Sequence, residues 1–477
     1  MRITRNRALT WISAAAIVTG GAGAAAVALA GQGGSPVPPS FAPIGTYATG
    51  LTGGTSAETS ALAGGRLYVT NSTGNSLDIV DVRDPSRPAL ERRIDLAPWG
   101  SGPNSVDVSG GLVAVAVEAS PPTAPGRVVF LRRDGSHVAD VAVGALPDML
   151  TFDDDGRQVI VANEGEASGY GTADAVDPEG SVSIISTKDI GRRAPSVRTV
   201  AFTAFNAGGA RHAELPSGIR LNGPGASVAQ DLEPEYVTVT EKGRTAHVTL
   251  QEANAVAEID LRRARVTRIF SLGTKDHSQP GMGLDPSDRD GANLIGTWPV
   301  RGLYMPDAIA SFTVRGRDYL ITANEGDGRD RPGFSDEGRV SSLTLDPTAF
   351  PDAAALKAPA ALGRLTVSTT DGRAADGEYE ALYAFGARSA TIWRTDGRRV
   401  WDSGDRIEQK VAADQPGAFN ANNDTNSRDD RSDNKGPEPE GVAVGRIGSR
   451  TYAFVGLHGL RRQRPLRADA RAVGEQP

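Results

Sequence analysis

"PDAIASFTVRGRDYLITANEGDGRD" (residues 306–330) opens with a Pro-Asp pair and ends in a cluster of acidic residues. An earlier stretch, "PDMLTFDDDGRQVIVANEGEASGY" (residues 147–170), has the same parts in the same order. Each has Pro-Asp, a short apolar run, a turn with Gly, a second apolar run and then Asn-Glu-Gly-acid. Internal similarity of this kind predicts a repeat architecture.

Further copies of this unit occur along the chain. "GPNSVDVSGGLVAVAVEAS" begins at Gly102, "EPEYVTVTEKGRTAHVTLQEAN" at Glu233 and "PEGVAVGRIGSRTYAFVGL" at Pro439. A copy from Ala57 lacks the Pro, and the copy from Gly377, "GEYEALYAFGARSATIWRTDG", is the most degenerate. Counting these openings predicts seven units.

Each unit shows the alternation of apolar residues that is typical of β-strands, as at Val159 and Val161. A third alternating stretch follows in "SLDIVDV", "RVVFLRR", "SVSIIST", "AVAEIDL" and "RVSSLTL", and a fourth often comes after it. Four short antiparallel strands in each unit are typical of a propeller blade. The sequence therefore predicts an all-β fold, a seven-bladed β-propeller, and shows no long amphipathic helix.

The two ends of the chain differ from the repeats. Residues 1–30 have a basic start, an apolar run and Ala-Leu-Ala, which predicts a secretory signal peptide, with an uncleaved membrane anchor as the alternative. Residues 31–40 are interpreted as a linker and 41–457 as the propeller, with Phe41–Gly50 as the outer strand of the last blade. Residues 458–477 form a basic tail without strand alternation, so we expect the last blade to be incomplete.

Composition limits the classes of function. The 477 residues carry a net charge of −7, and no basic stripe stands out, so nucleic acid is not expected as the main partner. The chain has no cysteine, which excludes disulfides, a thiol nucleophile and thiolate metal ligands. No membrane span is expected in the mature chain.

The acidic residues of the repeats are the main candidate site. They stand at the unit openings and just after the second strand, so equivalent placement in successive blades would bring them together at one mouth of the ring. Converging carboxylates need cations or protons, and oxygen donors without thiols favour calcium. The metal-ligand candidates are Asp148, Glu164, Glu235, Glu252, Asp307, Glu325 and Glu440, with Glu118 in an equivalent position. The alternative is that each carboxylate accepts hydrogen bonds from backbone N–H groups at turns.

Three long polar insertions, at about residues 203–233, 274–305 and 412–437, interrupt the repeats. Loops of this length in a compact fold are usually functional or ordered by ions. Two of them resemble calcium loops without completing the pattern of twelve residues, and solvated acidic loops are the alternative. Their candidate ligands are Asp285, Asp288, Asp290, Asn422, Asp424, Asn426, Asp429, Asp430 and Asp433.

The motifs that begin at Pro147, Glu233, Pro306 and Pro439 resemble those of the choice-of-anchor I family, exported bacterial propellers similar to the mesenchyme-specific cell-surface glycoproteins of animals. The resemblance implies an extracellular or surface location and a propeller of the quinoprotein or YVTN type. Some relatives are labelled alkaline phosphatase or are joined to nucleotidase-like domains. The chain departs from the family pattern after Leu457.

Familiar catalytic motifs are missing: the sequence has no G-x-S-x-G, P-loop or H-E-x-x-H. We expect a secreted or cell-surface binding module with calcium as the candidate cofactor, and an extracellular protein, glycan or phosphorylated ligand as partner. A metal-dependent phosphoesterase is the alternative. In that case Arg301, Arg329 and Arg331 would hold phosphate oxygens, and His277 is the histidine to test.

Overall fold

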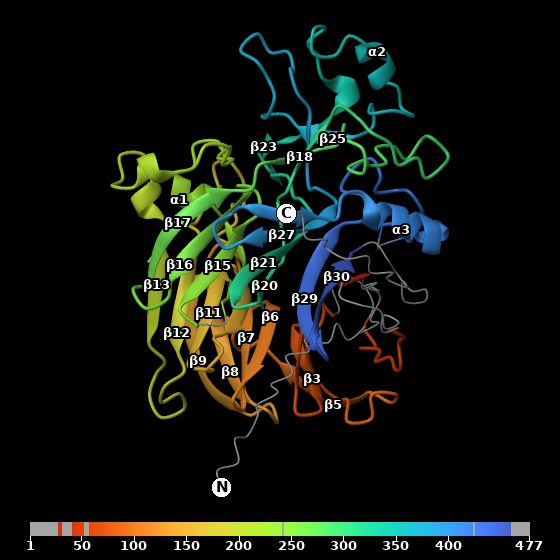
Figure 1. Ribbon diagram of the computed structural model, residues 1–477. Coiled ribbons are helices and arrows are strands. Elements are labelled where there is room, and N and C mark those ends of the chain that lie inside the picture. The colour runs from red at the N-terminus through yellow and green to blue at the C-terminus, as the bar shows by residue number, and fades with distance from the viewer. Residues whose placement is uncertain (1–26, 31–40, 52–56, 241–242, 423–424, 459–477) are drawn as a thin grey trace.

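The computed structural model describes residues 27–30, 41–51, 57–240, 243–422 and 425–458, and most of its regular structure is β-strand (Figure 1). Five antiparallel sheets of four strands dominate it. They consist of β2 (Ser60–Ala63), β3 (Arg66–Asn71), β4 (Ser76–Asp81) and β5 (Ala89–Asp95); β6 (Gly102–Ser109), β7 (Leu112–Glu118), β8 (Pro125–Arg132) and β9 (His137–Ala145); β10 (Pro147–Phe152), β11 (Gln158–Asn163), β12 (Ser181–Ser186) and β13 (Val197–Ala201); β14 (Pro234–Val239), β15 (Thr245–Leu250), β16 (Ala255–Asp260) and β17 (Arg265–Ser271); and β20 (Ile309–Val314), β21 (Arg317–Asn324), β27 (Ser389–Arg394) and β28 (Arg399–Asp402).

The first strands of these sheets contact one another in chain order, β2 with β6, β6 with β10, β10 with β14, and β14 with β20. The series continues from β20 to β29 (Pro439–Ile447). Side chains join neighbouring sheets near the openings: Asn104 Nδ2 donates to the carbonyl of Pro147 (3.2 Å), and Thr249 Oγ1 donates to that of Asp307 (3.0 Å). This radial order of sheets is that of a β-propeller, and the predicted fold class is confirmed.

The prediction of seven blades is not confirmed, because the copy at Gly377 does not form a sheet of its own. Its apolar stretch is β27, which pairs with β21 and so supplies the third strand of the blade that opens at Pro306. The stretch "RVSSLTL" was expected to be that third strand. It lies instead in an insertion, as the end of β24 (Glu337–Arg339) followed by a 3₁₀ turn (Val340–Ser342). An insertion between β21 and β27 thus separates two strands that pair in space.

This insertion and the segment before β20 together build a second layer of strands on the ring. A five-stranded sheet has the order β18 (Thr274–Asp276), β19 (Arg301–Leu303), β26 (Tyr383–Ala384), β25 (Thr366–Ser368) and β24, and it lies beyond the ends of the blades in Figure 1. A hairpin of β22 (Asp330–Arg331) and β23 (Phe334–Ser335) precedes it. The described helices are short: α1 (Val228–Asp231), α2 (Ala353–Leu356), α3 (Arg406–Asp414), and the 3₁₀ turns Thr203–Phe205, His212–Glu214, Val340–Ser342 and Pro416–Ala418.

The last sheet has three strands in the described part of the chain, in the order β1 (Val27–Ala30), β30 (Arg450–Leu457) and β29. The expectation that Phe41–Gly50 forms its outer strand is wrong, because this segment has no strand and Val27–Ala30 pairs with β30 instead. Phe41 packs its ring edge-on against Phe454 at 5.2 Å. The remainder of the predicted signal peptide, the linker at 31–40 and the tail from residue 459 lie outside the described residues.

The backbone at the openings explains how the acidic residues are aimed. In four copies the residue before the Pro has a positive φ, between 40° and 46°. These residues are Leu146, Glu233, Met305 and Glu438. In three of these copies the register of the pairing between the first and second strands shifts just after the Pro, for example between Pro147 and Leu150. A bulge re-aims the side chain within it, so the acid after the Pro leaves the regular alternation of the strand.

Neighbouring blades bury apolar faces against each other. Phe130 of β8 and Leu150 of β10 belong to one such layer, and Val182 of β12 and Val248 of β15 belong to the next. Trp393 of β27 is 2% exposed, packs edge-on against Tyr304 at 5.0 Å, and donates its indole N–H to Thr322 Oγ1 (2.9 Å).

Replacing Trp393 with alanine tests the assignment of β27 to this blade. The Trp393→Ala variant is expected to lose about 3–5 kcal/mol of unfolding free energy, because it leaves a cavity and removes the partner of Thr322. The matched control is Val400→Ala on β28, where the side chain is exposed and a change within about 0.5 kcal/mol is expected. Denaturant unfolding measures both. A Trp393→Ala loss as small as that of the control would contradict the packing.

Candidate functional site

The repeats place their acidic residues around one mouth of the ring, and we call the following seven the mouth acids. Asp148, Glu235, Asp307 and Glu440 follow the opening Pro of their blades, and Glu164, Glu252 and Glu325 follow the second strands. They come from four sheets. Six of the mouth acids are half-buried, and the seventh, Glu252, is 8% exposed.

The electrostatics of the mouth acids show that they lie near one another. Burial raises the pKa of Asp148 to about 7, and three nearby carboxylates, led by Glu58, add to the rise. Burial raises the pKa of Glu164 well above its usual range, with Asp148 as the next cause.

The other side of the mouth behaves in the same way. Burial raises the pKa of Glu235 well above its usual range, and Asp307 is the largest of its charged neighbours. For Asp307 the causes are burial and then Glu325, followed by Glu440 and Asp148. The two copies that open at Pro147 and Pro306 therefore direct their acids to the same mouth, as their shared sequence predicts.

Few cations face these carboxylates. In the described residues, Lys435 Nζ donates to Glu325 Oε1 (3.0 Å) and to Asp327 Oδ1 (3.4 Å), and His458 Nδ1 lies 3.5 Å from Glu440 Oε2. The other five mouth acids have no Arg, Lys or His of the described chain at ion-pair distance. The mouth therefore keeps an excess of negative charge or holds protons.

Neutral and internal contacts account for part of the arrangement. With its amide oriented to satisfy both ends, Gln251 donates to Glu235 Oε1 (3.2 Å) and accepts from the backbone N–H of Asp307 (3.2 Å). Glu252 is different, since no side chain of the described residues donates a hydrogen bond to its buried carboxylate. Its own backbone N–H bonds to the carboxylate, so the alternative from sequence, in which each carboxylate accepts from backbone N–H groups, accounts for part of the environment of Glu252.

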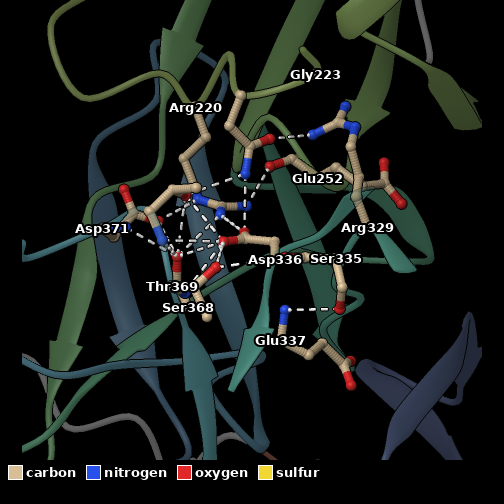
Figure 2. A network of polar contacts seen from close by, with 12 residues as sticks. Arg220, Gly223, Glu252, Arg329, Ser335, Asp336, Glu337, Ser368, Thr369 and Asp371 are labelled. Carbon is tan, nitrogen blue, oxygen red and sulfur yellow. Dashed lines mark hydrogen bonds and ion pairs between the residues drawn. The ribbon is translucent and has the colours of Figure 1, made fainter. Parts of the chain in front are cut away.

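Arginines clamp the first insertion and the second strand layer over this mouth (Figure 2). Arg220 is 6% exposed and donates to Asp371 Oδ2 (2.6 Å), to the carbonyl of Glu252 (2.9 Å) and to Asp336 Oδ2. Asp336 is fully buried, and its other oxygen accepts from Ser368 Oγ (2.9 Å). This network joins residues more than a hundred positions apart in the sequence and ties the first insertion to the second strand layer.

Arg329 supplies a second clamp beside the first. It is 5% exposed and donates through Nη2 to Glu233 Oε2 (2.5 Å) and to the carbonyl of Asp231 (2.7 Å), and through Nη1 to Asn222 Oδ1 (2.7 Å). Figure 2 shows its guanidinium close to the carboxylate of Glu252, with no hydrogen bond between them. Its Nη1 and Nη2 are engaged by the protein and its Nε is buried without a partner, so Arg329 is poorly placed to hold phosphate.

The other candidates for phosphoester chemistry are placed as follows. Arg331 pairs with Glu166, and Arg301 is exposed on β19. His277 is fully buried, with Nδ1 lying 2.6 Å from the carbonyl of Met282, and burial lowers its pKa well below the usual range. Asp276 does not pair with His277 but accepts from Ser278 Oγ (2.6 Å).

Several acids of the insertions are bound by arginine. Arg364 donates to Asp288 Oδ1 (2.9 Å) and to Asp433 Oδ2 (2.6 Å), which links the second and third insertions. Asn422 donates to Asp430, Asn426 has an exposed side chain, and Asp424 lies outside the described residues. The remaining candidates, Asp285, Asp290 and Asp429, lie near one another, because Asp290 and Asp429 both raise the pKa of Asp285.

Sequence reasoning missed Lys435, Arg220, Asp336 and the two pre-proline glutamates. A signal for the glutamates exists, since two openings have Glu-Pro-Glu, and each first Glu binds an arginine: Glu233 binds Arg329 and Glu438 binds Arg431. The partners of Arg220 carry no local signal, because they are distant in the sequence.

Within the described ranges, no three His, Asp or Glu side chains are grouped so that they could hold a metal ion. In the same part of the chain, no helix is long and apolar enough to cross a membrane.

The raised pKa values predict how stability depends on pH. The pKa of Asp148, Glu252 and Glu325 rises to about 7 in the folded chain, mainly by burial, whereas unfolded carboxyl groups titrate near pH 4. The folded state then binds more protons, so its stability is greatest below about pH 4 for these groups and is lost as the pH rises to about 7. The melting temperature is expected to fall between pH 5 and pH 8.

An Asp307→Asn variant sharpens this measurement. Removing one repelling carboxylate is expected to raise the melting temperature at pH 8 and to flatten the decline, by up to about 1.4 kcal/mol per pH unit for one group. Asp174→Asn, at an exposed position that is not one of the mouth acids, is the control and should leave the decline unchanged. A melting temperature that rises from pH 5 to pH 8 would contradict the buried-acid description.

The chain is similar in sequence to known proteins. Residues 60–461 match the family described as "Choice-of-anchor I domain". Gigasin-3a of Magallana gigas is 43% identical over 103 residues, which are 20% of this chain and 36% of that protein. The mesenchyme-specific cell surface glycoprotein of Strongylocentrotus purpuratus is 30% identical over 288 residues, which are 53% of this chain and 37% of that protein. The chain thus spans little more than a third of the length of these two relatives.

Among solved structures, the β-propeller domain of Cps50 (Swd1) from Myceliophteria thermophila is similar, with a TM-score of 0.33 and 9% identity. The similarity covers 71% of this chain and 82% of that one. The sequence match to the family is the stronger finding, because it extends over most of the propeller. The chain belongs to the choice-of-anchor I domain family.

Proposed function

We propose that this chain is an extracellular or cell-surface β-propeller module that binds positively charged groups at its acidic mouth. The single observation that carries the proposal is the convergence of seven carboxylates from four sheets with so few facing cations. The location rests on the family and on the relative whose name describes a cell surface glycoprotein, together with the predicted signal peptide.

Lys435 illustrates the chemistry of the proposed ligand. Its ammonium group is bound by Glu325 and Asp327 at the edge of the mouth. Burial lowers the pKa of Lys435, but the neighbouring carboxylates raise it by more, so the net shift is upward. An external ammonium or guanidinium group would find carboxylate oxygens of the same kind at the mouth acids without an ion pair, Asp148 and Asp307 among them. Such groups on an extracellular protein are the proposed partner, and calcium is the inorganic cation with the same preference for oxygen.

The mouth is less suited to the other partners considered. A phosphorylated ligand or an acidic glycan would add negative charge to carboxylates that already repel one another. A phosphoesterase would also need free arginines at the acids; Arg329 and Arg331 are both paired with acids, and of the three candidates Arg301 alone has no acid partner among the described residues. Binding therefore accounts for the geometry better than hydrolysis does.

Isothermal titration calorimetry tests the proposal with two separate ligands, a lysine-rich peptide and calcium chloride. Binding of a cation is expected near pH 8, with weaker binding near pH 5, where the mouth acids hold protons. The double variant Asp148→Asn/Asp307→Asn should bind at least about tenfold more weakly, a loss of about 1.4 kcal/mol. Binding of calcium without the peptide would identify the ligand as an ion rather than a basic protein.

The control is Asp174→Asn, which removes one exposed acid and should bind as the unaltered chain does. Raised salt should weaken peptide binding, because the attraction is between charges. If neither cation binds at pH 8, or if the double variant binds both as tightly as the unaltered chain, the proposed function is wrong.

A further inference from the structure

The second and third insertions meet in a buried cluster that is separate from the mouth acids. Asp285 is 0% exposed, Glu408 of α3 is 1% exposed and Asn420 is 2% exposed. Each of the three keeps one side-chain oxygen that is buried and has no hydrogen-bond partner: Asp285 Oδ2, Glu408 Oε2 and Asn420 Oδ1. Buried polar atoms are normally satisfied, so three such acceptors in one cluster require an explanation.

Hydrogen bonds hold the three residues side by side. Arg388 Nη1 donates both to the carbonyl of Asp285 (2.7 Å) and to Glu408 Oε1 (2.9 Å). Asn420 Nδ2 donates to the same Glu408 Oε1 (2.9 Å) and to Ser432 Oγ (2.9 Å). The donors in the cluster are thus committed to one oxygen of Glu408, and the second oxygen is left over.

Further acids surround the cluster. Ser432 Oγ donates to Asp429 Oδ1 (2.7 Å), and the backbone N–H of Ser287 lies 3.3 Å from Asp285 Oδ1. Burial raises the pKa of Asp285 to about 8, and Glu408, Asp290 and Asp429 are charged neighbours that add to the rise. Arg388 is the guanidinium that faces this group, and it pairs with Glu408 rather than with the Asp285 carboxylate.

We propose that the cluster of Asp285, Glu408 and Asn420 binds a hard divalent cation of the calcium class. The three unpartnered atoms are two carboxylate oxygens and one amide oxygen, and oxygen sets of this kind are preferred by calcium over softer metals. Two acids and an amide form a donor set different from the groups of three His, Asp or Glu that are absent from the described residues. Arg388 already bridges the carbonyls of Asp285 and Ser432 at this point, and the cation would join the second and third insertions through the side-chain oxygens that this arginine leaves without a partner.

The site is independent of the proposed function, because none of the mouth acids belongs to it. The Arg364 contacts to Asp288 and Asp433 lie in the same two insertions and provide a matched control. Asp288 is a neighbour in sequence of Asp285, but its carboxylate is already occupied by a guanidinium. Loss of charge alone can therefore be separated from loss of a ligand.

The experiment compares thermal unfolding of the full chain in chelator and in millimolar calcium chloride, with elemental analysis of the same samples. The unaltered chain should retain calcium and gain about 2–4 °C in melting temperature, since a ligand that binds the native state stabilises it. Asp285→Asn should lose the bound calcium and the gain, and it should melt in chelator at least as high as the unaltered chain. Asp288→Asn should keep the calcium-dependent gain.

A second variant protects the test against misfolding. Asn420→Asp replaces the amide with a third carboxylate, so it should melt lower in chelator and show a larger gain with calcium than the unaltered chain. Asp307→Asn, at the mouth, should still show the calcium-dependent gain that Asp285→Asn lacks, which separates this site from any calcium that the mouth acids bind. Absence of calcium from the unaltered chain, or an equal gain in Asp285→Asn, would overturn the proposal.

Discussion

Repulsion between carboxylates at the mouth of the ring is the constraint around which the rest of the structure is arranged. Four blade openings direct an acid inward, because the left-handed residue before the Pro and, in three of them, the bulge after it take that side chain out of strand alternation. Separate blades then bring like charges together in partly desolvated surroundings. Protons or cations are needed to offset the repulsion, and the pKa of Asp148 and of Asp307 is raised first by burial and then by the neighbouring carboxylates.

The insertions respond to this constraint with arginine and lysine. Arg329 binds Glu233, Arg431 binds Glu438, and Lys435 binds Glu325, so the insertions bring cations to acids at or beside the blade openings. Removing one partner of such a buried pair leaves an uncompensated charge, which is far more costly than the net contribution of the pair. The long loops are therefore parts of the charge balance of the ring as well as decoration of its surface.

Much of the fold and of the placement of the acids could be predicted from sequence, because the copies of a repeat share one motif and therefore one local structure. The Pro-acid openings predicted the four-stranded sheets, and the shared motif at Pro147 and Pro306 predicted that their acids lie at one mouth. The degenerate copy at Gly377 misled the count, since its strand β27 completes a blade whose first strands precede a long insertion. The N-terminal partner of β30 was also misplaced, because Val27–Ala30 was assigned to the signal peptide.

What the sequence could not show is pairing between distant insertions. Asp288 and Asp433 were candidates for calcium, but both contact Arg364, and no local pattern connects these three positions. For the same reason the sequence could not show the cluster of Asp285, Glu408 and Asn420, because their unpartnered oxygens come together only in the folded chain. Spacing within one loop predicts ligands that share that loop, whereas this fold gathers its polar clusters across loops.

The central claim is that mouth acids such as Asp148 and Asp307 hold protons at neutral pH and that a bound cation displaces these protons. Proton linkage tests it directly, by measuring the enthalpy of cation binding at pH 7 in buffers that differ in their ionisation enthalpy. The account predicts an enthalpy that changes from buffer to buffer in the sense of proton release, with a smaller change in Asp148→Asn/Asp307→Asn. Binding with an enthalpy that is the same in every buffer would contradict it.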